Sequence, residues 1–219
     1  MGSITDSSGG AGAGRRRRWT NVLGRLSLTL ALALTLGGCD RGREPPADDK
    51  AVQDLTGAAF GRHFELSDHA GQRRRLADYA GKVVVLFFGY TQCPDVCPTT
   101  LSTMREAIEL LGPDAGKVQV LFATIDPERD SAEMLAQYVG AFHPSFVGLR
   151  GNDAQTASMV REFKLTVVRF PTANGQYTVD HSVGSYVFDR GGHLRLYLPH
   201  GHPPRAVADA LRRLLIEPA

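Results

Sequence analysis

The stretch FFGYTQCPDVCPTTLS, residues 87–102, begins inside a long apolar run and contains two cysteines, Cys93 and Cys97. The run, KVVVLFFGY at residues 82–90, is continuous and rich in β-branched side chains, which is typical of a strand buried on both faces. After Cys97, apolar residues recur at the spacing of one helix face, at Leu101, Met104, Ile108 and Leu111. The cysteines therefore lie where a buried strand ends and a helix begins, a position where sites form in open α/β sheets.

The rest of the chain alternates strands with helices. Further strands are expected at residues 118–125, 145–151, 182–189 and 193–199, and further helices at residues 131–142, 153–163 and 203–216. A hairpin is expected at residues 63–81, and an inserted hairpin with an Asn174-Gly175 turn at residues 165–179. This order predicts an α/β fold with helices on both faces of the sheet. The arrangement is thioredoxin-like, with an N-terminal hairpin and an inserted β-hairpin before the histidine-bearing strand.

Each cysteine is followed by a proline. Pro98 suits the first turn of a helix, where the missing N–H is no loss, and Pro94 stiffens the loop. Backbone N–H groups at a helix start favour a thiolate over a thiol. Both sulfurs are therefore expected to be preorganised and reactive.

Three residues separate the two cysteines, whereas thioredoxins have two. The longer loop still permits a Cys93–Cys97 disulfide, and it also lets two thiolates open around a soft ion. Two thiolates alone do not close a zinc site, but with one imidazole they suit monovalent copper. From the spacing alone, disulfide chemistry and metal binding both stay open.

His181 is the best candidate for such an imidazole. It stands in VDHSVGSYVFD, residues 179–189, and is expected in the loop before a strand, facing the helix that carries the cysteines. Thioredoxin-like redox enzymes place a cis-proline in that loop, whereas this chain has Asp-His-Ser, which favours a ligand. Asp180 is a candidate to orient the imidazole. His200 and His202 in PHGHPP can chelate a metal as a short pair, but a polar loop before a helix explains them more simply.

The motif DPERD, residues 126–130, permits two interpretations. In the structural one, Asp130 caps the helix that follows and Pro127 shapes the loop, as Asp153 is expected to cap the helix after it. In the functional one, the motif forms an acidic rim that helps to dock a partner.

The N-terminus predicts export and lipid attachment. A basic run at residues 15–18 precedes a short apolar core at residues 26–36, which is too short for a transmembrane helix and right for a signal peptide. The core ends in LGGC, which resembles a bacterial lipobox with Cys39 as the lipidated residue. Residues 1–38 are therefore expected to be a lipoprotein signal peptide, and residues 39–57, rich in Arg, Asp, Pro and Ala, a flexible tether.

Removal of the signal peptide changes the charge of the chain. It takes away five of the 25 basic and one of the 23 acidic residues, which leaves a net charge of −2. No basic patch is then expected, and nucleic acid is not predicted as a partner. The remaining residues 58–219 have the size of one domain.

Three motifs in order give a specific resemblance. GYTQCPDVCPTTL, ATIDPERDSAEMLAQYV and VDHSVGSYVFDRGG are similar to those of the Sco/SenC family of copper chaperones for cytochrome c oxidase assembly. The resemblance implies a thioredoxin-like fold, anchorage at the periplasmic face of a bacterial membrane, and copper, as Cu(I) or also Cu(II), bound by Cys93, Cys97 and His181.

The resemblance also implies partners: the copper-receiving subunit of the oxidase and other periplasmic copper carriers. The function expected is metallochaperone rather than enzyme. The alternative is a thiol–disulfide reductase that acts on cysteines of the oxidase subunit or of other exported proteins, by thiolate attack and a mixed disulfide.

Overall fold

The computed structural model describes residues 52–172 and 175–218 of the 219-residue chain. These residues belong to one compact unit, Ala47–Ala219. The predicted signal peptide, Cys39 and Asn174 of the predicted hairpin turn lie outside the described residues.

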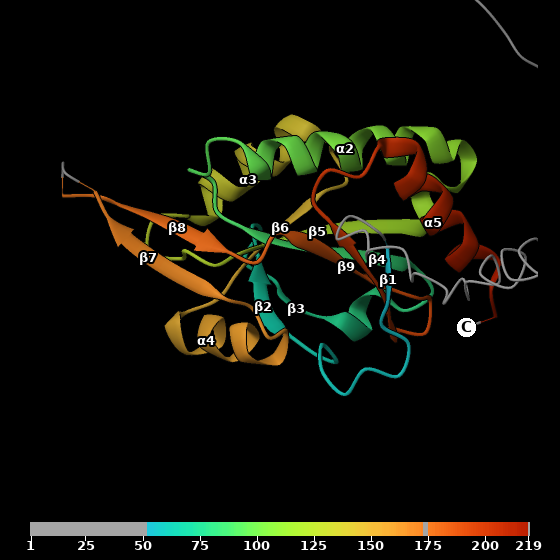
Figure 1. Cartoon of the computed structure of the whole chain (residues 1–219), viewed down its shortest axis with the longest axis horizontal. Helices are drawn as coiled ribbons and strands as arrows, with labels where there is room; N and C mark the ends of the chain where they lie inside the picture. The colour runs from blue at the N-terminus through green and yellow to red at the C-terminus, as the bar shows by residue number, and fades with distance from the viewer. Residues whose placement is uncertain (1–51, 173–174, 219) are drawn as a thin grey trace, which may run out of the picture. The chain divides into compact units, whose positions relative to one another are not determined.

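An eight-stranded mixed sheet forms the centre of this unit (Figure 1). In spatial order its strands are β1 (Gln53–Asp54), β10 (Leu194–Pro199), β9 (Gly184–Phe188), β4 (Val83–Gly89), β5 (Val118–Thr124), β6 (Val147–Arg150), β2 (Glu65–Asp68) and β3 (Arg73–Arg75). β4 pairs with β5 and β5 with β6 in parallel, and the other neighbours are antiparallel. Every residue of β4 and β5 is buried, as their continuous apolar runs predict.

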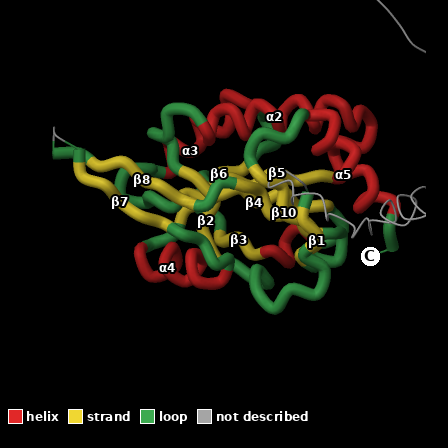
Figure 2. The backbone as a smooth tube through the Cα atoms, viewed as in Figure 1, coloured by secondary structure: helices red, strands yellow, loops and turns green. Residues whose placement is uncertain are grey.

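Helices cover both faces of the sheet (Figures 1 and 2). The α-helices are α2 (Val96–Leu111), α3 (Ala132–Phe142), α4 (Asp153–Glu162) and α5 (Pro204–Ile216), and the short 3-10 helices are η1 (Leu76–Tyr79) and η2 (Gly112–Lys117). α2, α3 and α5 lie on one side and α4 on the other. The prediction of an α/β fold with helices on both faces is confirmed.

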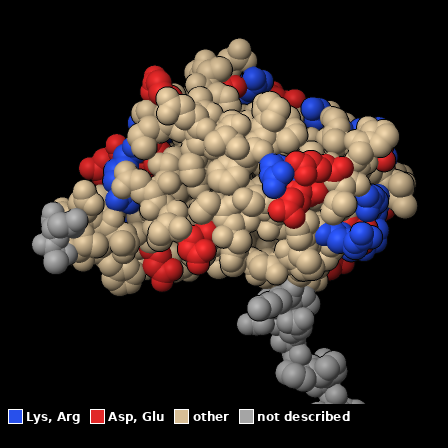
Figure 3. Space-filling view, turned by 90° about the horizontal axis from the view of Figure 1, so that it is seen from above, with Lys and Arg blue, Asp and Glu red and all other residues tan. Residues whose placement is uncertain are grey.

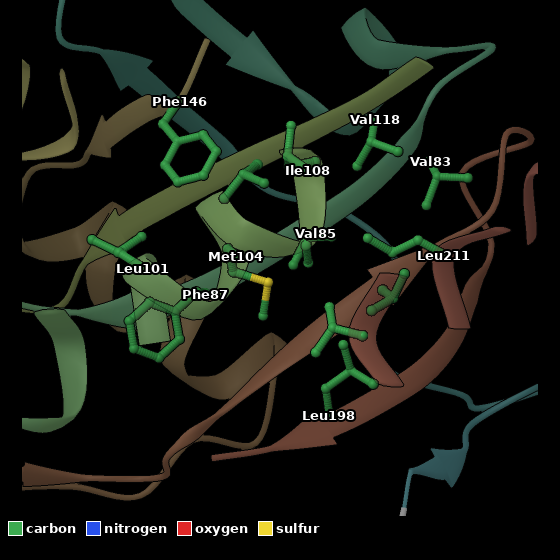
Figure 4. Close-up of a cluster of buried hydrophobic side chains, with 14 of the residues drawn as sticks. Val83, Val85, Phe87, Leu101, Met104, Ile108, Val118, Phe146, Leu198 and Leu211 are labelled. Carbon is green, nitrogen blue, oxygen red and sulfur yellow. The ribbon is translucent and has the colours of Figure 1, made fainter. Parts of the chain in front are cut away.

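One face of the sheet packs its apolar side chains against α2, α3 and α5. Figure 4 shows this cluster, in which Leu101, Met104 and Ile108 of α2 face the strand residues Val85 and Phe87. The helical spacing seen in the sequence is thus the buried side of α2. The first turn of the helix, which carries Cys97, is held by the same packing.

A separate two-stranded ribbon, β7 (Val167–Pro171) paired with β8 (Tyr177–His181), is the inserted hairpin (Figure 1). The hairpin was predicted, but His181 is its last residue and does not lie in a loop between the hairpin and the next strand. Since Val167 of β7 pairs with His181, the ribbon itself positions the imidazole.

Three boundary predictions were wrong. The predicted tether reached residue 57, but β1 at Gln53–Asp54 already pairs with β10. The cap of α4 is Asn152, whose side chain accepts a hydrogen bond from the Gln155 amide, rather than Asp153. The cap of α3 is Ser131, which accepts a hydrogen bond from the Met134 amide, and Asp130 instead turns inward.

The surface carries charges of both signs. On the face in Figure 3, acidic and basic side chains form small groups around a wide uncharged area. The edge strand β3 consists of three arginines, of which Arg74 pairs with Asp68 and Arg75 with Glu65. Within residues 52–172 and 175–218, no helix is long and apolar enough to cross a membrane.

Candidate metal centre

The two cysteines lie at the junction between β4 and α2. Cys93 is half-buried in the connecting loop, and its amide donates to the Tyr90 carbonyl at 3.2 Å. Cys97 is fully buried in the first turn of α2. Both are free thiols. The sulfur of Cys97 fits over Gly89, because a Cβ at residue 89 would lie only 2.6 Å from it.

The two thiols have opposite electrostatic properties. A hydrogen bond from the Cys97 thiol lowers the pKa of Cys93 to about 5, with further help from the backbone amides of Cys97 and Asp95 and from His181. The same hydrogen bond, together with burial, raises the pKa of Cys97. Cys93 is therefore the thiolate of the pair at neutral pH, and Cys97 is its proton donor.

Asp130 fixes the start of the cysteine loop. Its buried carboxylate accepts hydrogen bonds from the Thr91 amide at 3.0 Å, the Thr91 hydroxyl at 2.6 Å and the Thr124 hydroxyl at 2.6 Å. Arg150 in turn donates to the carbonyl of Asp130 at 2.9 Å. Because one carboxylate joins the ends of β4 and β5, the loop that carries Cys93 starts from a rigid point.

His181, the last residue of β8, is the third candidate ligand. Its side chain is 9% exposed, and its ring lies edge-on to that of Tyr90, with the ring centroids 6.1 Å apart. The Nδ1 atom is 2.8 Å from the Ser182 carbonyl. A carbonyl can only accept, so Nδ1 carries the proton and, in the neutral ring, Nε2 keeps its lone pair. That is the form in which an imidazole binds a metal.

Asp180 does not orient His181. The Asp180 side chain is exposed, because it points to the face of β8 opposite to that of the buried His181. The Ser182 carbonyl, and not Asp180, holds the imidazole. Asp95, between the cysteines, is exposed.

Asp126 ties the hairpin of His181 to the loop after β5. Its buried carboxylate accepts from the Tyr177 hydroxyl at 2.7 Å and from Arg129. Arg129 also donates to the Tyr177 carbonyl at 2.8 Å and lies over the Tyr177 ring, 3.9 Å from its centroid. Both aspartates of the DPERD motif are thus buried, so they form no acidic rim.

The three candidate ligands do not form a finished site. Cys93 and Cys97 shift each other's pKa in opposite directions, and His181 is close enough to influence Cys93 electrostatically. Among the described residues, however, no three His, Cys, Asp or Glu side chains are grouped tightly enough to hold a metal ion. The arrangement offers a reactive thiolate, a buried thiol and an imidazole nitrogen at one end of the sheet.

Sequence reasoning missed the roles of three residues that shape this end of the sheet. Gly89 makes room for the Cys97 sulfur, Asp126 anchors the hairpin, and Tyr90 packs beside His181. Gly89 and Tyr90 could have been noticed, because they stand directly between the buried strand and the cysteines. The contact between Asp126 and Tyr177 joins residues 51 positions apart, and no local pattern indicates it.

Comparisons with known proteins show which family this chain resembles. The SCO1/SenC family model matches residues 52–216. The mitochondrial protein SCO2 homolog of Bos taurus is 35% identical over 201 residues, which cover 86% of this chain and 74% of that protein.

Two solved structures with copper bound are also similar. ScoI of Bradyrhizobium japonicum has 36% identity and a TM-score of 0.67, and the match covers 72% of this chain and all of that one (100%). Yeast Sco1 has 28% identity and a TM-score of 0.65, with 73% of this chain and 90% of that chain covered. These relatives confirm the thioredoxin-like fold. Because the family model spans most of the sequence and a relative exceeds 30% identity, the chain belongs to the SCO1/SenC family.

Proposed function

We propose that this protein is a membrane-tethered copper metallochaperone that binds Cu(I) through Cys93, Cys97 and His181. The observation that carries the proposal is a thiolate–thiol pair with an imidazole near enough to lower the pKa of Cys93. The Ser182 carbonyl holds Nδ1 of that imidazole, so Nε2 keeps its lone pair in the neutral ring. The copper is cargo, held until a partner takes it.

The donor set favours copper in its monovalent state. Thiolates are soft ligands that select Cu(I), which accepts three-fold coordination. A structural zinc site has four protein ligands. Tyr90, beside His181, is buried and supplies an apolar wall. Because two of the ligands stand on separate segments, the loop and the hairpin, a partner thiolate can replace them one at a time.

Membership of the SCO1/SenC family supports a specific recipient for the copper. The copper would go to the binuclear copper site of cytochrome c oxidase, and other periplasmic copper carriers would supply it. The lipobox-like LGGC supports attachment through Cys39 at the periplasmic face of a bacterial membrane.

A competition titration with a Cu(I) chelator tests the ligand set. The detergent-solubilised full chain is compared with His181→Ala, and His63→Ala, whose side chain is 78% exposed, serves as the matched control. Loss of a direct ligand is expected to weaken binding at least about tenfold, since even loss of a group that only orients a ligand costs that much. The control should bind as the native chain does. Equal affinity of all three proteins would remove His181 from the site.

The contrast between the two thiols favours a second candidate function, thiol–disulfide reduction. The Cys93 thiolate would attack a substrate disulfide and release one substrate thiolate, and Cys97 would then resolve the mixed disulfide. The substrate gains two electrons and two protons as the Cys93–Cys97 disulfide forms. A reductase does not need the imidazole, so His181→Ala would keep this activity while losing copper affinity.

A further inference from the structure

A small cavity lies between α2 and the loop that follows β10. Its lining includes Thr100 and Met104 of α2, Ser185 of β9, and His200 and His202 of the loop. Its volume is about 10 Å³, roughly the room that one water molecule or one bare ion takes.

Two polar atoms in this lining have no partner. The hydroxyl of Ser185, a residue only 1% exposed, has no hydrogen-bond partner within residues 52–172 and 175–218, and neither has the buried Nε2 atom of His202. A buried polar atom without a partner costs free energy, so two such atoms on one cavity indicate that something polar or cationic completes them.

A third donor is already oriented. His200 Nδ1 lies 2.9 Å from the Thr100 hydroxyl, and this contact holds the ring against α2. When the Nδ1–H group donates to the hydroxyl, the other ring nitrogen is left with its lone pair, as in histidines that bind metals. Thr100 stands one helical turn after Cys97, about 4.5 Å along the helix axis.

Met104 adds a soft sulfur. Its side chain is 3% exposed and extends from α2 toward Leu198, which also lines the cavity (Figure 4). Thioethers, like thiolates, prefer monovalent copper. Of the residues that the structure describes, no carboxylate or thiolate lines the cavity, so these residues supply no negative charge to balance a divalent ion. A monovalent cation is easier to desolvate there.

We propose that this cavity is a second, weaker Cu(I) site, with His200, His202 and Met104 as ligands and the Ser185 hydroxyl beside the ion. The choice of copper rests on the proposed function, whereas the cavity and its unpartnered atoms do not. The site would hold a cation one to two turns of α2 away from Cys97, and its neutral ligands would release it more readily than thiolates do.

Silver(I) and Cu(I) binding to the full chain without its thiols tests the proposal. In a Cys39→Ser, Cys93→Ser, Cys97→Ser background, one equivalent of either ion is expected to bind. The added change His202→Ala or the volume-conserving Met104→Leu should weaken this binding at least about tenfold. His63→Ala is the matched control and should leave it unchanged. Circular dichroism and thermal unfolding check that each variant is folded.

A second arm of the test uses the Cys39→Ser chain, in which Cys93 and Cys97 are intact. It should bind a second, weaker equivalent that His202→Ala removes, and this arm remains informative if the thiol-free background does not fold. Absence of binding to the folded thiol-free chain, or equal losses in His202→Ala and His63→Ala, would overturn the proposal and leave water as the occupant. A wrong assignment of the main site would give a different result: tight Cu(I) binding would remain undiminished after Cys93 and Cys97 are both replaced.

Discussion

The sulfur of Cys97 occupies the space that a side chain at residue 89 would need, since a Cβ on Gly89 would lie 2.6 Å from Cys97 Sγ and 2.8 Å from the Phe122 ring. The last residue of β4 must therefore be glycine for the first turn of α2 to approach so closely. The position of one proposed ligand thus depends on a residue that has no side chain.

We expect Gly89→Ala to displace the Cys97 sulfur. Overpacking of this kind costs about 1–3 kcal/mol of unfolding free energy, and copper affinity should fall with it. Thermal unfolding and Cu(I) competition measure the two effects. Gly140→Ala is the control, because nothing lies within 4 Å of a Cβ there and alanine is the better helix former. Equal stability of Gly89→Ala and native protein would show that the close fit is unimportant.

Asp130→Asn should loosen the start of the cysteine loop. The amide cannot accept all the hydrogen bonds that the carboxylate receives from Thr91 and Thr124, so about 1.5–3 kcal/mol of unfolding free energy should be lost. Hydrogen exchange of the Thr91 amide should accelerate. Glu128→Gln, on a side chain that is 68% exposed in the same motif, should change stability by less than about 0.5 kcal/mol. Similar effects of both changes would contradict the role assigned to Asp130.

Cys93 should react with iodoacetamide far below the pH at which ordinary thiols do. Its pKa of about 5 makes the alkylation rate fall only as the pH drops through that value. Because this folded pKa is below the unfolded one, the ionised thiol contributes stability that is fully present above the unfolded pKa and lost as the pH falls through about 5. In Cys97→Ala the S–H donor is absent, so the midpoint should move upward. A native midpoint at the ordinary thiol value would refute this assignment.

Oxidation should abolish copper binding at the main site. A Cys93–Cys97 disulfide removes both sulfurs as metal ligands, and the two thiols are near enough to shift each other's pKa. The experiment titrates Cu(I) into Cys39→Ser protein before oxidation, after complete thiol oxidation and after re-reduction. Tight binding that survives in the oxidised protein would show that the cysteines are not the ligands.

Cys39→Ser should prevent lipid attachment. The native chain is expected to incorporate labelled fatty acid in a bacterial host, and the variant is not, because the serine cannot form the thioether to the lipid. Cys93→Ser should be labelled as the native chain is. Label on the Cys39→Ser protein would contradict the lipoprotein interpretation.

The sequence was most informative where a local pattern decides the structure. The apolar runs of β4 and β5 and the helical spacing of α2 predicted the central layer, and therefore the place of the cysteines. These patterns work because burial on both faces leaves little choice of residue type.

Other features depended on contacts that are distant in the sequence. In one of the two interpretations of DPERD, Asp130 caps α3. Ser131 offers the same capping oxygen one residue later, and the Asp130 carboxylate pairs instead with Thr91, 39 positions away. His181 was placed beyond the hairpin because the end of β8 has no turn residue to mark it. The histidines at residues 200 and 202 were explained as a polar loop, since their cavity exists only when α2 and β9 come together.

The three arginines of β3 have a consequence for how copies of this protein meet. Among the described residues, β3 is the last strand at one edge of the sheet, and a second copy aligned against it would bring arginine side chains opposite one another. At the other edge, the described part of the chain contributes the two-residue strand β1. At high concentration, copies of this protein should therefore resist pairing edge to edge into a continuous intermolecular sheet, which is the first step toward a fibril. Because this resistance comes from charge repulsion, added salt should weaken it.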